Sequence, residues 1–96
     1  MSGKSKFLFL KLFFSSYKID NYQGMSFDVK ANKSTTIQIW INGYPNQKLV
    51  LQINTSVKTV NVNFADLGIT SGYCHGIEFQ PFEDNTILEI NNIAFN

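Results

Sequence analysis

The chain contains no arginine, and its charge is low and evenly balanced. Its 96 residues include eight lysines and seven acidic residues, which gives a net charge of +1. Nucleic-acid sites rely on arginine for bidentate contacts with phosphates and guanines, and they usually form a basic patch. The lysines here are scattered from Lys4 to Lys58. We therefore expect no nucleic-acid partner.

Cysteine is almost absent as well. Cys74 is the single cysteine, so the chain can form no internal disulfide and has no thiol pair for a zinc site. We expect this residue to be a small buried hydrophobic side chain. Two acidic residues and an asparagine, Glu83–Asn85, could offer oxygens to calcium, but three adjacent residues make an incomplete site. No cofactor or metal is predicted.

Long apolar runs are missing too. The Phe-rich segment Phe7–Phe14 is interrupted by Lys11 and is too short to span a bilayer as a helix, so no membrane partner is expected. With Lys4 and Lys6 before it, the segment has some features of a signal peptide. Its short length, its internal charge and the lack of a small-x-small cleavage site favour a first β-strand instead.

No stretch shows a sustained helical period, but apolar and polar residues alternate repeatedly. A period of two places one side of a strand in a core and the other in solvent. Turn sequences such as Asn42-Gly43 separate these runs at intervals of about 8–12 residues. We predict a single domain over residues 1–96, an all-β antiparallel sandwich of about seven strands. The predicted core comprises Phe27, Val29, Ile37, Ile39, Leu49, Leu51, Val60, Val62, Ile77, Phe79 and Ile90.

The last alternating segment changes phase. Leu88 and Ile90 share one parity, whereas Ile93 and Phe95 share the other, and the change falls at Asn91-Asn92. A β-bulge there would turn all four apolar side chains toward the core. The sequence therefore predicts a bulge in the final strand.

Several segments resemble a known family. The closing segment 87–95, the run Met25–Ala31, the run Ile37–Gly43 and the segment 76–80 are similar to strands of jelly-roll, galactose-binding-like carbohydrate-binding modules. Such modules accompany glycoside hydrolases, and the similarity covers about residues 22–96. The resemblance implies a jelly-roll sandwich that is extracellular, binds a polysaccharide without catalysing a reaction, and belongs to a parent hydrolase. Modules of this kind are usually longer and hold a structural calcium, for which this chain shows no obvious acidic cluster.

Trp40 is the most informative residue for function. It lies between Ile39 and Ile41, so it should point away from the core, and an exposed aromatic residue marks a binding surface. A flat indole can stack on the apolar face of a sugar ring while polar neighbours bind its hydroxyls. Losing the indole should then leave the fold intact. The alternative is that the N-terminal segment covers this face and buries Trp40. The predicted ligand-binding residues are Trp40, Gln38, Asn42, Tyr44, Gln52, Glu78 and Gln80, with Trp40, Gln38 and Gln52 as the best-supported group.

Catalysis has little support in the sequence. Paired carboxylates hydrolyse glycosidic bonds, but Glu78 and Glu89 are expected to be solvated charges on strands. Cys74 and His75 are adjacent on a strand and should point to opposite faces, which separates thiol and imidazole. We predict that the chain is not an enzyme. The alternative to a polysaccharide-binding module is an assembly domain, in which Trp40 and the Phe-rich segment form an interface with another protein or a second copy.

Overall fold

The described residues form eight short strands and two single turns of 3₁₀ helix. In the computed structural model the described residues are 3–5, for which the backbone is described, and 10–96. Neither of the described helical turns is long or apolar enough to cross a membrane. The elements in chain order are β1 (Gly3–Ser5), β2 (Leu10–Lys18), η1 (Ile19–Asn21), β3 (Gly24–Ala31), β4 (Thr35–Ile41), β5 (Leu49–Ile53), β6 (Lys58–Asn63), η2 (Ala65–Leu67), β7 (Tyr73–Pro81) and β8 (Leu88–Phe95).

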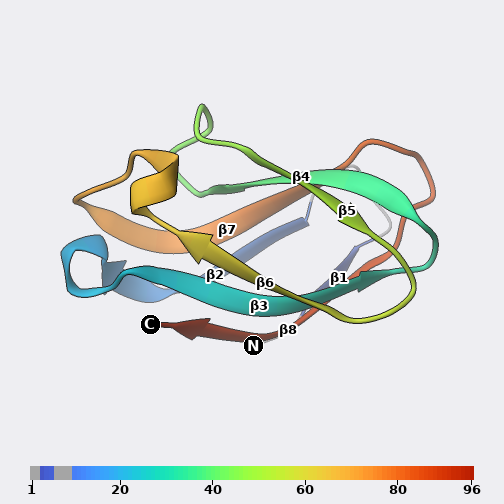
Figure 1. Ribbon diagram of the computed structural model, residues 1–96, viewed down its shortest axis with the longest axis horizontal. Helices are drawn as coiled ribbons and strands as arrows, with labels where there is room; N and C mark the ends of the chain where they lie inside the picture. Colours follow the sequence, from blue (N-terminus) through green and yellow to red (C-terminus); the bar gives the residue numbers. More distant parts are fainter. Residues whose placement is uncertain (1–2, 6–9) are drawn as a thin grey trace.

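The strands form two packed antiparallel sheets (Figure 1). The back sheet has the order β1-β8-β3-β6, and the front sheet has the order β2-β7-β4-β5. Strands pair as β1 with β8, β2 with β7, β3 with β6 and β4 with β5, as in one long antiparallel ribbon. Rolling this ribbon up adds the pairs β3–β8 and β4–β7. The result is a jelly roll, which confirms the predicted fold class.

The core lies between the two sheets, where the alternating side chains of both meet. Phe27 on β3 and Phe79 on β7 are fully buried, and their rings make an edge-to-face contact at 5.3 Å across the sandwich. Nine of the eleven predicted core residues are buried. Leu49 and Leu51 are the exceptions: they lie on the edge strand β5 and are only partly buried against the core.

The predicted bulge in the last strand is present. Asn92 has a φ of 58°, in the left-handed region, and the β3–β8 register shifts by one residue between Ser26 and Asp28. Leu88 and Ile90 are fully buried before the bulge, and Ile93 and Phe95 pack against the core after it. Asparagine tolerates positive φ better than most residues, because its short side chain bonds locally.

A second irregularity lies where β2 pairs with β7. The register shifts between Phe13 and Tyr17, so that two additional residues of β2 bulge outward. Residues 10–14 of the Phe-rich segment belong to β2, which confirms the strand interpretation for that part; residues 7–9 lie outside the described residues. Gly76 is required opposite this segment, because an added Cβ would lie 2.4 Å from the Leu12 carbonyl oxygen.

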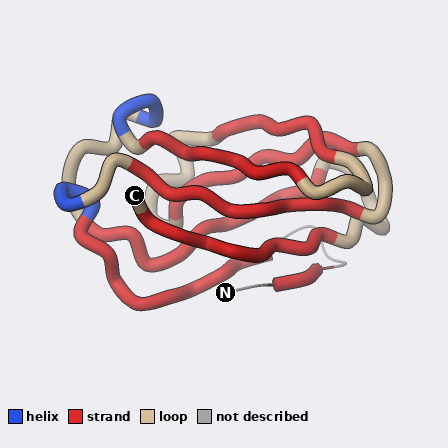
Figure 2. Tube along the Cα trace, turned by 60° about the horizontal axis from the view of Figure 1, so that its bottom comes forward, coloured by secondary structure: helices blue, strands red, loops and turns tan. Residues whose placement is uncertain are grey.

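The connections gather at the two ends of the sandwich. Figures 1 and 2 place both helical turns at one end. The loops around residues 32–34, 54–57 and 82–87 lie together at the other end (Figure 1). Backbone bonds join these loops, from Ala31 N–H to the Asn54 carbonyl (2.8 Å) and from Asn32 N–H to the Ile87 carbonyl (3.1 Å). The strands between the ends therefore present two outer faces.

Candidate functional site

The outer face of the front sheet carries most of the predicted binding residues. They fall on rungs, which are rows of residues that lie opposite one another on paired strands and point to the same face. Successive rungs are two residues, or roughly 7 Å, apart along a strand. Four rungs follow from the registers and backbone bonds: Phe82–Thr36–Gln52, Gln80–Gln38–Val50, Lys11–Glu78–Trp40 and Phe13–Gly76–Asn42. Sequence parity thus identified the correct face for Gln38, Trp40, Asn42, Gln52, Glu78 and Gln80.

Trp40 differs from its predicted state. It does point away from the isoleucine row, but only 6 % of its surface is exposed, so the prediction of a solvent-presented indole is wrong. Two neighbours on the same face contact the indole. Lys48 places its ammonium 5.2 Å from the ring centroid, in a cation–π contact. The indole Nε1–H donates to Glu78 Oε2 at 3.0 Å. Trp40 is therefore a buried residue of the sheet surface, in contact with a lysine and a glutamate.

Glu78 is the acceptor at the centre of this arrangement. It is 8 % exposed, contrary to the expectation of a solvated charge. Besides the Trp40 indole, Asn42 Nδ2 donates to its Oε2 at 3.2 Å, and Lys11 Nζ lies 3.5 Å from its Oε1. A carboxylate this buried is stable only when it is paired and hydrogen-bonded. Glu78 therefore links β2, β4 and β7 on the outer face.

Side-chain amides pair on the neighbouring rungs. Gln38 donates its Nε2–H to Gln80 Oε1, and Thr36 donates its hydroxyl to Gln52 Oε1 at 3.0 Å. Gln52 lies two rungs from Trp40, about 13 Å along the strand direction. Thr36 and Gln52 also border a hollow of about 430 Å³ toward the 82–87 loop. This half of the face offers neutral donors and acceptors.

Exposed apolar side chains flank these polar groups. Phe13, Val50 and Phe82 are 62 %, 56 % and 55 % exposed. Phe82 occupies the first rung and Phe13 the fourth, so the two phenyl groups are about 20 Å apart along the strands. The face is thus a mixed strip of aromatic ends and an amide-rich middle.

Tyr44 does not join this strip, which corrects its predicted role. It lies in the loop after β4, where Asn42 and Gly43 turn the chain, and it packs against the core. Its hydroxyl donates to the Ser71 carbonyl at 3.2 Å. Gly72 has a φ of 104°, and a Cβ there would lie 2.5 Å from the Tyr44 hydroxyl. Tyr44 closes the end of the sandwich.

The structure brings together one pair that the sequence analysis missed. Ser16 Oγ and His75 Nδ1 are 2.7 Å apart on the outer side of the β2 bulge, and the His75 ring stacks on Tyr73. The signal was a change in alternation. Leu12 and Phe14 pack against the core, and Tyr17, three residues later, lies on the same side, because its ring stacks on Phe95. Both residues of the pair are exposed, and the contact stabilises the bulge.

The remaining titratable candidates do not assemble into a catalytic centre. Glu89 lies on the back sheet, where it pairs with Lys30 at 3.6 Å, so it is on the opposite face from Glu78. Cys74 is buried, and desolvation raises the pKa of its thiol to about 11. That matches the predicted buried hydrophobic residue. Absence of catalysis stays a prediction.

The acidic turn 83–85 makes contacts of its own. Glu83 Oε1 accepts a bond from the Thr35 hydroxyl at 2.7 Å, and the Asp84 carbonyl accepts one from Lys33 Nζ at 2.9 Å. Across the described part of the chain, no three His, Cys, Asp or Glu residues gather as a metal site would require. The prediction that the chain needs no cofactor is not tested by this arrangement.

The outer face of the back sheet is different in character. Asp28 accepts bonds from Asn92 Nδ2 at 2.8 Å and from the Thr59 hydroxyl at 2.7 Å. These two donors, Asn92 first, hold the pKa of the Asp28 carboxyl below its usual value. The surrounding side chains of β3 and β6 are small and polar. This face lacks the aromatic flanks of the front sheet among the side chains described.

Comparisons with known proteins add no family to this description. No protein-family model matches the chain, and no curated protein matches it either.

Proposed function

We propose that the domain is a non-catalytic carbohydrate-binding module that holds a neutral polysaccharide on the outer face of the front sheet. The observation that carries the proposal is the amide-rich middle of that face, where Gln38 pairs with Gln80 and Thr36 with Gln52. A side-chain amide has two donor hydrogens and an acceptor oxygen with two lone pairs. Each paired glutamine therefore keeps unused hydrogen-bonding capacity. Sugar hydroxyls, which both donate and accept, match such groups without any charge.

The flanking residues support the same ligand. Phe82 is exposed on the first rung, beside Thr36, and can pack against the apolar face of a sugar ring. Trp40 takes a different role from the one its sequence position suggested. It packs under Lys48 and donates to Glu78, which keeps the floor of the face rigid beneath a ligand. An extracellular location and a parent glycoside hydrolase belong to this proposal.

The test is affinity electrophoresis in gels that contain a soluble glucan, xylan or mannan. At least one polysaccharide should retard the domain. Gln38→Ala should weaken retention by roughly 2- to 13-fold, because one hydrogen bond contributes about 0.5–1.5 kcal/mol. Phe82→Ala should weaken it further. The matched control is Asn61→Ala, an exposed amide on the back sheet, which should bind as the unmodified domain does. Equal losses in Asn61→Ala and Gln38→Ala would contradict the assignment of the face.

Assembly is the second candidate, and the exposed apolar residues favour it. Phe82 and Val50 lie on adjacent rungs and Phe13 lies at the other end of the same face, and exposed apolar side chains on one face are typical of protein contact surfaces. The partner would be a second copy of this chain or another protein. In that case the domain would sediment as an oligomer, Phe13→Ser would shift it toward the monomer, and no polysaccharide would retard either protein.

A further inference from the structure

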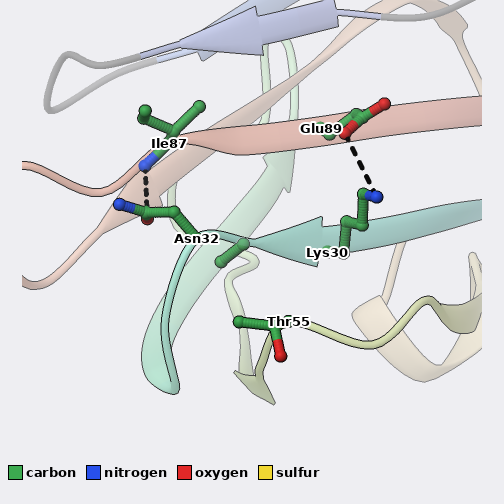
Figure 3. A pocket seen from close by; sticks show the side chains of 6 residues that line it. Lys30, Asn32, Thr55, Ile87 and Glu89 are labelled. Atoms are coloured by element: carbon green, nitrogen blue, oxygen red, sulfur yellow. Dashed lines mark hydrogen bonds and ion pairs between the residues drawn. The ribbon is translucent and has the colours of Figure 1, made fainter.

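The sequence contains the triplet Asn-x-Ser twice, as Asn32-Lys33-Ser34 and Asn54-Thr55-Ser56. In a chain that enters the secretory pathway, this triplet is the acceptor for N-linked glycosylation. The two triplets lie close together, since Asn32 and Thr55 border the same hollow (Figure 3). We propose that Asn54 is the glycosylated residue of this chain and that Asn32 is not.

Asn54 is an exposed residue. The residue follows β5 directly, and Asn54, Thr55 and Ser56 are all exposed. Asn54 Oδ1 accepts the backbone N–H of Ser56 at 2.8 Å, which folds the triplet into an Asx turn. Within residues 3–5 and 10–96, Nδ2 of Asn54 donates no hydrogen bond. The bond that anchors this loop uses the Asn54 backbone carbonyl, so modification of the side chain leaves it intact.

Asn32 has the same triplet but a fixed side chain. Its Oδ1 accepts the backbone N–H of Ile87 at 2.8 Å, and its Nδ2 donates to the Asn85 carbonyl at 3.1 Å. Figure 3 shows the Asn32 side chain directed at the start of β8, with the bond to Ile87 dashed. The amide is therefore held at both ends against the 82–87 loop. Asn32 is exposed as Asn54 is, so the difference between the two asparagines is the hydrogen bond that engages the Asn32 amide nitrogen.

The modification is a group transfer from a lipid-linked oligosaccharide diphosphate. The Asn54 Nδ2 atom forms a bond to the anomeric carbon of the sugar, and the bond between that carbon and the diphosphate oxygen breaks. The amide nitrogen loses one proton, and the lipid diphosphate leaves with the bonding electron pair. The folded chain supplies only the acceptor, since the transferase and donor belong to the host cell.

The test uses the full chain behind a cleavable secretion signal in a eukaryotic host. An affinity-tag linker with its own Asn-x-Thr triplet reports passage through the glycosylating compartment. Ser34→Ala and Ser56→Ala form a matched pair, because each removes one triplet and leaves both asparagines in place. The secreted proteins are digested with peptide-N-glycosidase, which converts a glycosylated asparagine to aspartate, and the converted position is read by peptide mass spectrometry.

The expected result is conversion at Asn54 in the unmodified chain and in Ser34→Ala, and complete loss of conversion at that residue in Ser56→Ala. Conversion at Asn32, with or without Asn54, would overturn the selection between the two triplets. A glycosylated linker with neither asparagine converted would overturn the proposal outright. The readout is a mass change at one residue, so it is independent of whether the domain retains any polysaccharide.

Discussion

Replacing Trp40 tests whether its buried indole stabilises the outer face of the front sheet. A buried tryptophan removes about 200 Å² from water, which at ~25 cal/mol per Å² corresponds to roughly 5 kcal/mol. Alanine keeps part of this burial, and on an outer face water refills the space, so we expect Trp40→Ala to cost about 3–4 kcal/mol. A 96-residue domain has a total stability of roughly 5–14 kcal/mol. The variant should therefore be strongly destabilised.

Trp40→Phe separates ring burial from the hydrogen bond. It keeps an aromatic ring over the sheet but removes the donor to Glu78, which still has Asn42 and Lys11 as partners. The expected cost is about 1–2 kcal/mol, which spans the upper part of the range for neutral hydrogen bonds and the lower part of the range for bonds to charged groups. That corresponds to a decrease of roughly 4–16 °C in melting temperature. This variant stays folded enough to measure even if the alanine variant does not.

The assay is urea denaturation followed by far-ultraviolet circular dichroism. Fluorescence cannot compare the variants, since Trp40 is the single tryptophan. Phe82→Ala is the matched control, an aromatic residue on the same face that is 55 % exposed, and it should change the free energy of unfolding by no more than about 0.5 kcal/mol. A cost below about 0.5 kcal/mol for Trp40→Ala would refute the burial and the role assigned to the indole.

Two further outcomes follow from burial and hydrogen bonding. Ile39→Ala should cost about 3–5 kcal/mol, because the side chain is fully enclosed, whereas Leu51→Ala on the half-buried edge should cost about 1–2 kcal/mol; equal shifts in urea midpoint would contradict this. Asp28 has a folded pKa below its ordinary 3.8, so its contribution to stability is present above that pH and is lost as the pH falls through the folded pKa. Denaturation midpoints measured between about pH 5 and about pH 2 should fall less steeply for Asp28→Asn than for the unmodified domain, and parallel curves would rule out this assignment.

The direction of each side chain was predictable because it is a local property of a strand. Alternation alone placed Phe27 inward and Gln38 outward, and the change of phase at Asn91-Asn92 was enough to reveal the bulge. A change of phase after Phe14 marks the bulge in β2 in the same way. It was harder to recognise, because the two residues at that point are serines, and neither has an apolar side chain that indicates which face it occupies.

The environment of Trp40 was not predictable in the same way. The contacts described for it come from Glu78, 38 residues away in sequence, and from Lys48, which directly precedes β5. Alternation does not specify the register between distant strands, so it cannot identify cross-strand partners. The predicted role of Tyr44 was wrong for a related reason. A loop residue does not follow the alternation of a strand, and the direction of the Tyr44 side chain is set by its hydrogen bond to the Ser71 carbonyl.

The position of β8 has a consequence for how the protein is made. Leu88–Phe95 lies between β1 and β3, inside the back sheet, yet it is the last described strand to leave the ribosome. Until then β3 lacks one of its two neighbours, and its apolar residues Met25, Phe27 and Val29 have no complete layer to cover them. An unpaired strand edge with apolar side chains can pair with another nascent chain. Aggregation during synthesis should therefore depend on how quickly β8 inserts, because β1 and β3 both pair with it.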